Sequence, residues 1–346
     1  MLPVDVIVKK IVIAMMNYRK DISFTVNSRK DINGIIDMVR YENVATFHVG
    51  DIMYNYNPYS KEVILRPRYL YKQNDYRSLI NKILAKLNEM KTEIMKFPSE
   101  LAREKYIHDY LCKNVVYKEI GPDAHCVLGP LFKGEGVCEG IAKTAQALLN
   151  FVGINSHIIC GDALEKDGRK TPHAWNVVQI NGHWHLLDIT YDNTLSDPNF
   201  IRYDYFNVTA KELSLTHTPY DYCQEHFYKC ITSKTYFSIF NLEFATYQAV
   251  CDYARREINK KAAYLYFKYI NKTSPIRIDV LVNYVLNLPN VNRVSYSYDE
   301  GTGIYLFEVF YNQSFLKNPL KKIIFSNISR FSIVLLLKGQ NGKEII

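Results

Sequence analysis

The chain has 346 residues, of which 48% are hydrophobic, as expected for a globular protein with well-buried cores. Its formal net charge is +8, and the lysines and arginines are spread along the chain without a basic block. This distribution is not typical of a nucleic-acid-binding arm, so we expect no nucleic-acid partner. No uninterrupted apolar run approaches the roughly 20 residues that a membrane-spanning helix needs, so we expect no membrane span.

The cysteines and the N-terminal segment bear on the cellular compartment. Seven cysteines, an odd number without tight spacing, predict reduced thiols rather than a disulfide scaffold. Asp5, Lys9 and Lys10 interrupt the apolar N-terminal segment, which is typical of an amphipathic helix rather than an export signal. The chain as it stands is therefore expected to be cytoplasmic. If a signal peptide has been removed from it, we expect an exported protein instead.

Residues 1–72 predict a small α/β domain. The expected elements are a helix through residue 18, an extended segment at 22–26, a helix at 32–41, and extended segments at 46–55 and 62–71. A strongly periodic helix over 75–97 follows, and Pro98-Ser99 precedes a further helix from Glu100. We assign these two helices to a central domain over residues 73–240.

The order of elements in the first domain recurs near the C-terminus, which predicts a second small α/β domain over 241–325. Its expected elements are a helix at 244–258, a strand at 263–270, a helix at 279–288, and strands at 294–298 and 304–311. The tail, 326–346, carries one apolar run at 331–337 that predicts a strand. Within the central domain, 203–206 and 236–240 are also expected to be extended.

Cys138 stands where a glycine-containing stretch meets a helical pattern. Gly134 and Gly136 precede it, and the apolar residues after it recur at a helical period from Ile141 to Leu149. Cys138 is therefore expected in the first turn of a helix. The unpaired N–H groups and the macrodipole at that end favour a thiolate over a thiol.

A hairpin is expected to place His173 beside Asp188. Asn181-Gly182 is the preferred pair for a two-residue type I′ turn, because both central positions need a positive φ. With these two residues as the loop, Asp188 lies opposite Trp175 and becomes a diagonal neighbour of His173 on the same face. Diagonal pairs lie roughly 7–8 Å apart, so a hydrogen bond between aspartate and histidine is feasible.

Three separated motifs occur in one order, and together they resemble a known family. They are Gly136-Val-Cys-Glu-Gly140, His173-Ala-Trp-Asn176 and Trp184-His-Leu-Leu-Asp-Ile-Thr-Tyr-Asp192, flanked by Tyr106-Ile-His-Asp-Tyr-Leu111, Val116-Tyr117, Tyr205-Phe-Asn-Val-Thr209 and His217. Over about residues 100–240 the chain resembles the bacterial transglutaminase-like branch of the papain-like cysteine enzymes. The resemblance implies an α+β fold whose core packs a cysteine-bearing helix on an antiparallel sheet bearing histidine and aspartate, here flanked by two small α/β domains.

The resemblance also implies roles for individual residues. Cys138 would be the nucleophile, His173 the base and Asp188 the orienting acid of an acyl transfer on peptide or protein amides through a thioester. A cysteine protease or amidase is favoured, because no acceptor-lysine or calcium-site motif stands out. The alternatives are a transglutaminase that links glutamine to amines and a non-catalytic protein-binding module that retains the fold.

Two aromatic residues near these motifs keep two interpretations each. The Tyr117 hydroxyl either donates the second hydrogen bond of an oxyanion hole or only packs, and Trp175 either lines the acyl pocket or fills the core. The predicted partner is a peptide or protein substrate, and no oligomeric state is predicted.

No cofactor and no metal are predicted. Cys223, His226 and Cys230 have a spacing that superficially resembles a set of zinc ligands. Zinc sites normally show a second paired set, and none accompanies these three residues.

Overall fold

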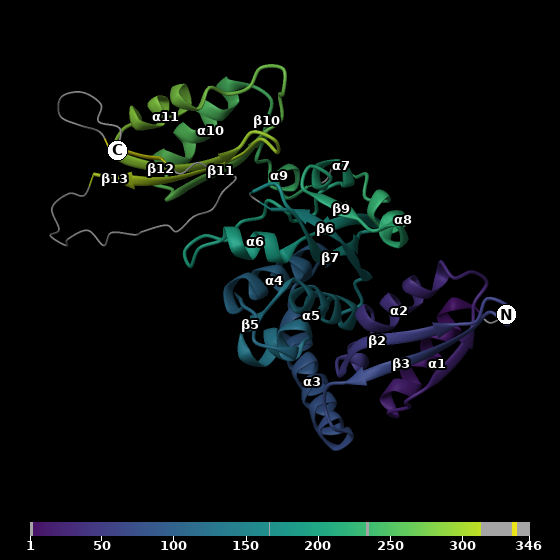
Figure 1. Ribbon diagram of the computed structural model, residues 1–346. Helices are drawn as coiled ribbons and strands as arrows, with labels where there is room; N and C mark the ends of the chain where they lie inside the picture. The colour runs from purple at the N-terminus through teal and green to yellow at the C-terminus, as the bar shows by residue number, and fades with distance from the viewer. Residues whose placement is uncertain (1–2, 166, 233–234, 313–333, 338–346) are drawn as a thin grey trace. The chain divides into compact units, whose positions relative to one another are not determined.

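The computed structural model of the chain describes residues 3–165, 167–232, 235–312 and 334–337 (Figure 1). The chain divides into two compact units, one of residues 1–165 with 169–232 and the other of residues 166–168 with 233–346. Within the described ranges, no helix combines the length and the apolar character needed to cross a membrane.

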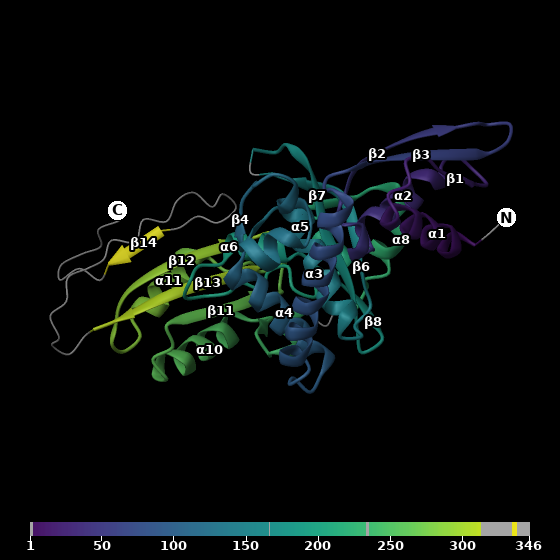
Figure 2. The ribbon, with the colours of Figure 1, turned by 90° about the horizontal axis from the view of Figure 1, so that it is seen from below.

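The first unit begins with a small sheet that two helices cover. Among residues 3–72, α1 (Val4–Met16) and α2 (Asp31–Tyr41) pack on the antiparallel strands β1 (Ile22–Thr25), β2 (Val49–Tyr56) and β3 (Glu62–Tyr69), in the order β1–β3–β2. Figure 2 shows both helices on one side of the β2–β3 pair. Val63 and Leu65 of β3 are fully buried, because alternate strand residues point to the same face. The elements predicted here are confirmed within a few residues.

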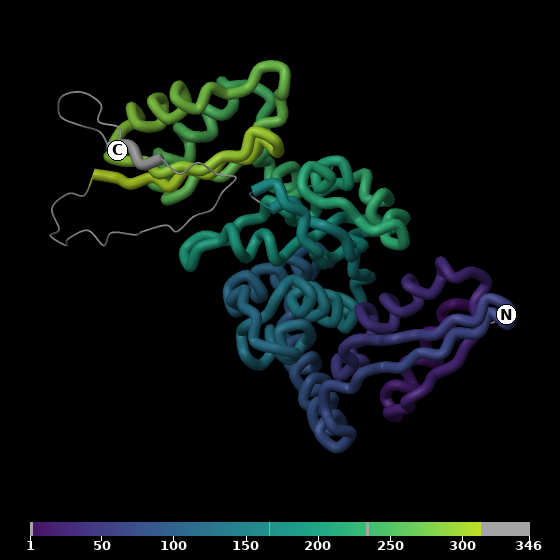
Figure 3. The backbone as a smooth tube through the Cα atoms, in the orientation of Figure 1, coloured from purple at the N-terminus to yellow at the C-terminus, as the bar shows by residue number. Residues whose placement is uncertain are grey.

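Two long helices lead into the centre of this unit, and Figure 3 follows the backbone through them. They are α3 (Gln73–Ile94) and α4 (Glu100–Asn114). The side chain of Ser99 caps α4 by accepting the N–H of Ala102 at 3.2 Å. Both predicted helices are confirmed.

A sheet of four strands, counted in the described part of the central region, forms the platform for the candidate site. The strands are β6 (Ser156–Leu164), β7 (Lys170–Ile180), β8 (His183–Leu187) and β9 (His217–Pro219), in the order β8–β7–β6–β9. Asn181 and Gly182 have φ values of 50° and 81°, and Ile180 pairs with His183. The predicted turn and register are confirmed.

Helix α5 (Cys138–Phe151) packs on β7 of this sheet. The side chain of Asn176 in β7 donates to the carbonyl of Ala142 in α5 at 3.0 Å. The helix starts at Cys138, as the sequence predicts, and a cysteine-bearing helix therefore lies on the sheet that carries His173.

Short elements complete the first unit. They are η1 (Val44–Thr46), β4 (Val116–Tyr117), η2 (Pro122–His125), η3 (Gly129–Lys133), β5 (Glu135–Gly136), α6 (Ile189–Leu195), α7 (Ala210–Leu213), η4 (Asp221–Cys223) and α8 (Gln224–Tyr228). The expectation that 203–206 is extended is wrong, because this segment forms turns. Its backbone bonds to α6 and the residue before it instead of to a strand: Tyr205 N–H donates to Asp192 Oδ1 at 3.0 Å and Asp188 N–H donates to Tyr205 O at 3.1 Å.

The second unit pairs a sheet with two helices on one face (Figure 1). Among its described residues the strands are β10 (Glu243–Phe244), β11 (Tyr264–Tyr269), β12 (Val291–Asp299), β13 (Ile304–Tyr311) and β14 (Val334–Leu337), in the order β10–β11–β13–β12–β14. Helices α10 (Tyr247–Asn259) and α11 (Ile278–Leu286) bury an aromatic core that includes Phe267 and Phe307.

Two segments of this unit differ from the strands expected from the sequence. Residues 236–240 are not extended, because Tyr236–Ile239 form the short helix α9, where Phe237 packs on Tyr266 with ring centroids 4.9 Å apart. The expected tail strand is present in part, since β14 pairs with β12; residues 326–333 and 338–346 lie outside the described residues. The α+β fold class is confirmed, while the domain boundaries proposed from the sequence stay predictions.

Candidate active site

Cys138 is the first residue of α5, and Val137 before it is extended, with φ −102° and ψ 178°. The parallel pair β4–β5 fixes the approach to this helix, since Lys118 N–H donates to Gly136 O at 3.0 Å. Gly140 lets the first turn lie close to Ala124, because an added Cβ would meet the Ala124 carbonyl oxygen at 2.1 Å. The thiol thus sits at a well-defined helix start, where N–H groups lack helical partners.

His173 of β7 and Asp188, which follows β8, meet at the end of the hairpin away from its turn. His173 Nε2 lies 2.7 Å from Asp188 Oδ2, and Asp188 is only 1% exposed. Asp188 directly follows β8 and caps α6, because its Oδ1 accepts the N–H of Tyr191 at 3.1 Å. The same aspartate therefore orients the histidine and starts the next helix.

Because Nε2 of His173 contacts Asp188, the other ring nitrogen, Nδ1, is left to interact with the thiol of Cys138. Burial disfavours the thiolate, but the hydrogen bond and charge of His173, with the N–H of Ala174, lower the pKa of Cys138 below its usual value. Burial also tends to lower the pKa of His173, whereas the charge of Asp188 raises it to about 10. These shifts favour a thiolate–imidazolium pair, and the structure brings all three predicted triad residues together.

A second histidine, His217 in β9, contacts the same carboxylate. Its Nε2 lies 3.0 Å from Asp188 Oδ2, and the residue is 2% exposed. Burial would raise the pKa of Asp188, but the charges and hydrogen bonds of His173 and His217 hold it far below its usual range. The sequence showed His217 only as a flanking match, because no local pattern relates it to Asp188.

Tyr117 of β4 lies beside the candidate nucleophile. Its hydroxyl lies near enough to Cys138 for the thiol and the backbone N–H of that residue both to affect its pKa. Burial and the charge of Cys138 raise the pKa of Tyr117 to about 12, so the hydroxyl keeps its proton at neutral pH. This position is next to the backbone N–H of Cys138, which as a helix-start donor could serve an oxyanion hole together with the Tyr117 hydroxyl.

Trp175 lies in the core rather than at an open surface, since it is 1% exposed. Its ring is stacked with His173 at a centroid distance of 5.9 Å and meets His217 edge-on at 5.0 Å. It supports the two imidazoles, and a part in lining a substrate pocket stays a prediction.

Glu139 follows the nucleophile and would disfavour a thiolate if its charge were unpaired. Three cations surround it: Lys143 at 2.7 Å, His125 at 3.0 Å and Arg40 at 3.4 Å. Burial raises the pKa of this carboxyl, but these partners outweigh it and bring the pKa to about 2. The negative charge beside Cys138 is therefore offset locally.

A family model described as the transglutaminase-like superfamily matches residues 89–189, a range that holds Cys138, His173 and Asp188. Residues 89–189 therefore form a transglutaminase-like domain. No curated protein matches the chain.

Two solved structures resemble parts of the chain. One, described as a TGase, is 16% identical, covers 49% of this chain and 50% of its own, and has a TM-score of 0.28. The other, described as a "putative cysteine protease" from Cytophaga hutchinsonii, is 15% identical, covers 40% of this chain and 61% of its own, and has a TM-score of 0.26. The chain thus spans about half to three-fifths of the length of these structures.

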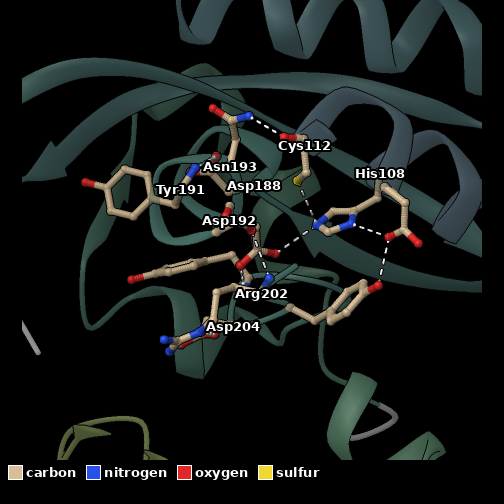
Figure 4. Close-up of polar contacts among 12 residues, drawn as sticks. His108, Cys112, Asp188, Tyr191, Asp192, Asn193, Arg202 and Asp204 are labelled. Carbon is tan, nitrogen blue, oxygen red and sulfur yellow. Dashed lines mark hydrogen bonds and ion pairs between the residues drawn. The ribbon is translucent and has the colours of Figure 1, made fainter. Parts of the chain in front are cut away.

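The transglutaminase-like core holds a second group of the same residue types (Figure 4). His108 of α4 is fully buried, with Nδ1 3.1 Å from Asp109 Oδ1 and Nε2 3.1 Å from Asp192 Oδ2. Cys112 Sγ lies 3.6 Å from the same Nε2. We call His108, Asp109, Cys112 and Asp192 the α4 cluster.

The protonation of the α4 cluster differs from that of the triad. Burial lowers the pKa of His108, but Cys112 and the two carboxylates raise it well above the usual value. Burial raises the pKa of Asp192 to about 7, against the effect of His108. Burial also raises the pKa of Cys112, and His108 offsets this only in part. The cluster therefore holds an imidazolium and a protonated thiol.

The site also contains side chains of the kinds that bind metal ions. One group among the described residues has ligand atoms that all lie within 4.8 Å of one another, namely His173, Asp188 and His217. Both histidine nitrogens bond Asp188 Oδ2, so the three side chains already form a hydrogen-bonded acid–base set. Cys223 Sγ instead accepts the N–H of Cys160 at 3.4 Å, and Cys230 Sγ donates to the carbonyl of His226 at 3.6 Å, so these two thiols turn to backbone rather than to a shared point.

Proposed function

We propose that this protein is a thiol-dependent acyl-transfer enzyme that acts on peptide or protein amides, as a cysteine protease or amidase. The observation that carries the proposal is that the two nitrogens of the His173 imidazole have different partners. Nε2–H is donated to Asp188 at 2.7 Å, and the other nitrogen is left for Cys138. That arrangement supplies a nucleophile, a proton carrier and a group that fixes the tautomer.

The reaction follows from this geometry. The Cys138 thiolate attacks the amide carbonyl carbon, and its backbone N–H with the Tyr117 hydroxyl stabilises the negative oxygen that forms. His173 gives its Nδ1 proton to the leaving amine as the carbon–nitrogen bond breaks, which leaves a thioester on Cys138. Water then attacks the thioester while His173 takes its proton, and the acid is released as the thiolate–imidazolium pair forms again.

The thioester can also pass its acyl group to an amine, which would make the protein a transglutaminase. Both reactions share every step up to the acyl-enzyme, so the nucleophile that reaches the thioester decides between them. No contact in the described residues favours an amine over water, and hydrolysis is the proposed outcome.

Two parallel experiments test the proposal, one on the reactivity of the cysteine thiols and one on the hydrolysis of amides. Iodoacetamide at neutral pH, followed by peptide mapping, should label Cys138 well before the other six cysteines. Amide hydrolysis of a peptide library should occur with the natural chain and with Cys112→Ala, but not with Cys138→Ala. Labelling of Cys138 no faster than the other thiols would contradict the proposal.

A fluorescent amine offered with a glutamine-bearing protein separates the alternatives. Incorporation of the amine in preference to hydrolysis would identify a transglutaminase. A reactive Cys138 with neither reaction would favour a binding module that retains the fold.

A further inference from the structure

Three N–H groups among the described residues donate to Asp188, and one of them belongs to a histidine outside the predicted triad. Oδ1 accepts the N–H of Tyr191 at 3.1 Å. Oδ2 accepts from His173 Nε2 at 2.7 Å and from His217 Nε2 at 3.0 Å. Because an ionised carboxylate only accepts, both imidazoles must carry a proton on Nε2.

His217 is itself held in one orientation. Its Nδ1 lies 2.6 Å from Thr216 Oγ1, and the strand pairing of β9 with β6 sets it opposite Ala163. The rings of Trp175 and Tyr191 lie against it, at centroid distances of 5.0 and 4.8 Å. The donor that His217 presents to Asp188 is therefore fixed from several sides, in a buried place where a lost hydrogen bond is not replaced cheaply by water.

We propose that His217 is a positioning residue for the triad, which fixes the plane of the Asp188 carboxylate so that Oδ2 stays on the Nε2–H of His173. The χ2 angle of an aspartate is broad, so one contact to His173 leaves the carboxylate free to turn. A second imidazole on the same oxygen, with Tyr191 on the other oxygen, removes that freedom. The inference rests on the proposed function, because it assigns His217 to the site through Asp188.

If His217 only filled space, a side chain of similar shape without an N–H donor could replace it. The variants are therefore chosen to keep or to remove the donor. His217→Gln keeps an N–H near the position of Nε2, whereas His217→Leu keeps a similar volume without a donor. His217→Asn serves where the leucine variant does not fold, because its amide is too short to reach Asp188. His48→Leu is the matched control, since His48 is also fully buried but bonds the carbonyl of Met15 at 3.1 Å.

The first measurement follows the hydrogen bond itself and needs no substrate. In proton NMR of the full chain, the Nε2–H of His173 should give a downfield resonance, assigned by its absence in His173→Gln. We expect the resonance in the natural chain, in His217→Gln and in His48→Leu, and its loss through exchange in His217→Leu or His217→Asn. An unchanged resonance in the two variants without a donor would overturn the proposal.

The second measurement asks whether His217 acts through Asp188. The rate of Cys138 alkylation by iodoacetamide at pH 7 should fall roughly 10-fold in His217→Leu, stay close to the natural rate in His217→Gln, and fall further in Asp188→Asn. The double variant His217→Leu/Asp188→Asn should match Asp188→Asn alone. The proposal would be overturned if the effects of His217→Leu and Asp188→Asn on the alkylation rate multiply in the double variant. It would also be overturned if Cys138 is alkylated as slowly in His217→Gln as in His217→Leu.

The two proposals fail in distinguishable ways. A chain without amide turnover contradicts the proposed function, while the NMR result still decides whether His217 holds Asp188 in place. A lost resonance in His217→Leu together with normal turnover would show that the contact exists but does not serve catalysis, which overturns the positioning role alone.

Discussion

Two groups of cysteine, histidine and aspartate lie in the first compact unit, and the segment around α6 supplies an acid to both. Asp188 caps this helix and bonds His173, while Asp192, one turn later, bonds His108. Figure 4 shows the second group, in which Cys112 and Asp192 both approach the His108 ring. The same three residue types therefore occur twice, with opposite consequences for the thiol.

The first difference concerns the two nitrogens of each imidazole. In His173, Nε2 serves Asp188 and Nδ1 is left for the thiol, so the ring can pass a proton between nucleophile and substrate. In His108, both nitrogens already face carboxylates, Asp109 and Asp192, each at 3.1 Å. Cys112 must share a nitrogen with Asp192, and the ring stays an imidazolium that has no place to accept a proton.

The second difference is the end of the helix at which each thiol stands. Cys138 begins α5, where the positive end of the macrodipole favours a thiolate. Cys112 lies two residues from the end of α4, where the dipole has the opposite sign. We therefore predict that the partners of the two imidazole nitrogens and the helix end at which the thiol stands, rather than the presence of the three residue types, determine which cysteine is reactive.

The largest expected effect separates the two cysteines directly. Cys138→Ala should reduce amide turnover by at least about 10⁴-fold, because no other group replaces the nucleophile. Cys112→Ala should change turnover by less than about 3-fold, since it removes a thiol that is protonated. Turnover per folded molecule, with circular dichroism as the control for folding, checks both, and a comparable loss in the two variants would refute the contrast.

The two acids around α6 provide the next comparison. Asp188→Asn should lower turnover roughly 10³- to 10⁴-fold with the fold retained, because the amide disturbs the tautomer of His173. Asp192→Asn should act chiefly on stability, because its amide N–H would face the proton of His108 in a buried place. Kinetics and urea unfolding of both variants measure this, and equal losses of turnover would show that the α4 cluster shares in the chemistry.

Tyr117→Phe tests the oxyanion role with a smaller expected effect. Loss of one donor should reduce kcat on the order of 10²-fold and leave KM nearly unchanged, because the hydrogen bond strengthens only as charge develops on the oxygen. Tyr110→Phe on α4 is a matched control. A drop confined to KM would place Tyr117 in substrate binding instead.

The pH dependence of alkylation should distinguish the thiols without mutation. His173 lowers the pKa of the Cys138 thiol and burial raises that of Cys112, so Cys138 should become reactive at a lower pH than Cys112. Turnover should fall near pH 10, where His173 loses the proton that the leaving amine needs. Rates from peptide mapping across pH 6–11 test this, and identical profiles for the two thiols would contradict it.

The smallest expected effect concerns Glu104, one turn before His108 on α4. Glu104 is fully buried, accepts from Asn207 at 2.9 Å and has one oxygen, Oε1, without a partner in the described structure. Burial raises its pKa from 4.5 to about 8, although Asn207 and His108 act in the opposite direction.

The sign of this shift makes the folded chain hold a proton that the unfolded chain loses. Glu104 should therefore contribute a stability that is present below about pH 4.5 and falls as the pH rises to about 8. Glu104→Gln should remove this slope and raise the free energy of unfolding at pH 8 by about 1–3 kcal/mol. Urea unfolding at pH 5 and pH 8 measures both, and an unchanged slope would refute the assignment.

Local signals in the sequence predicted most of the central architecture. Asn181-Gly182 needs two positive φ values, and that requirement sets the register that brings His173 to Asp188. The helical period after Cys138 places the thiol at the start of α5. These signals act over neighbouring residues or across one tight turn, where the geometry allows few alternatives.

Short segments rich in aromatic residues predicted secondary structure less well than the helix start and the turn did. Tyr203–Phe206 and Tyr236–Phe240 look like strands, but they form turns and a short helix. Short apolar runs fit several structures, and contacts elsewhere in the chain decide among them. For Tyr205, those contacts are the backbone bonds to Asp188 and Asp192.

The sequence by itself determined that Cys138 starts a helix and that His173 and Asp188 meet across a hairpin, because helix starts and two-residue turns are short-range features. Only the tertiary structure decided that His217 joins Asp188 from 29 residues away and that Tyr117 of β4 lies beside Cys138 at the start of α5. It also decided that Cys112 and Asp192 lie beside the same nitrogen of His108. Such contacts depend on how separate elements pack, and no residue pattern along the chain encodes that packing locally.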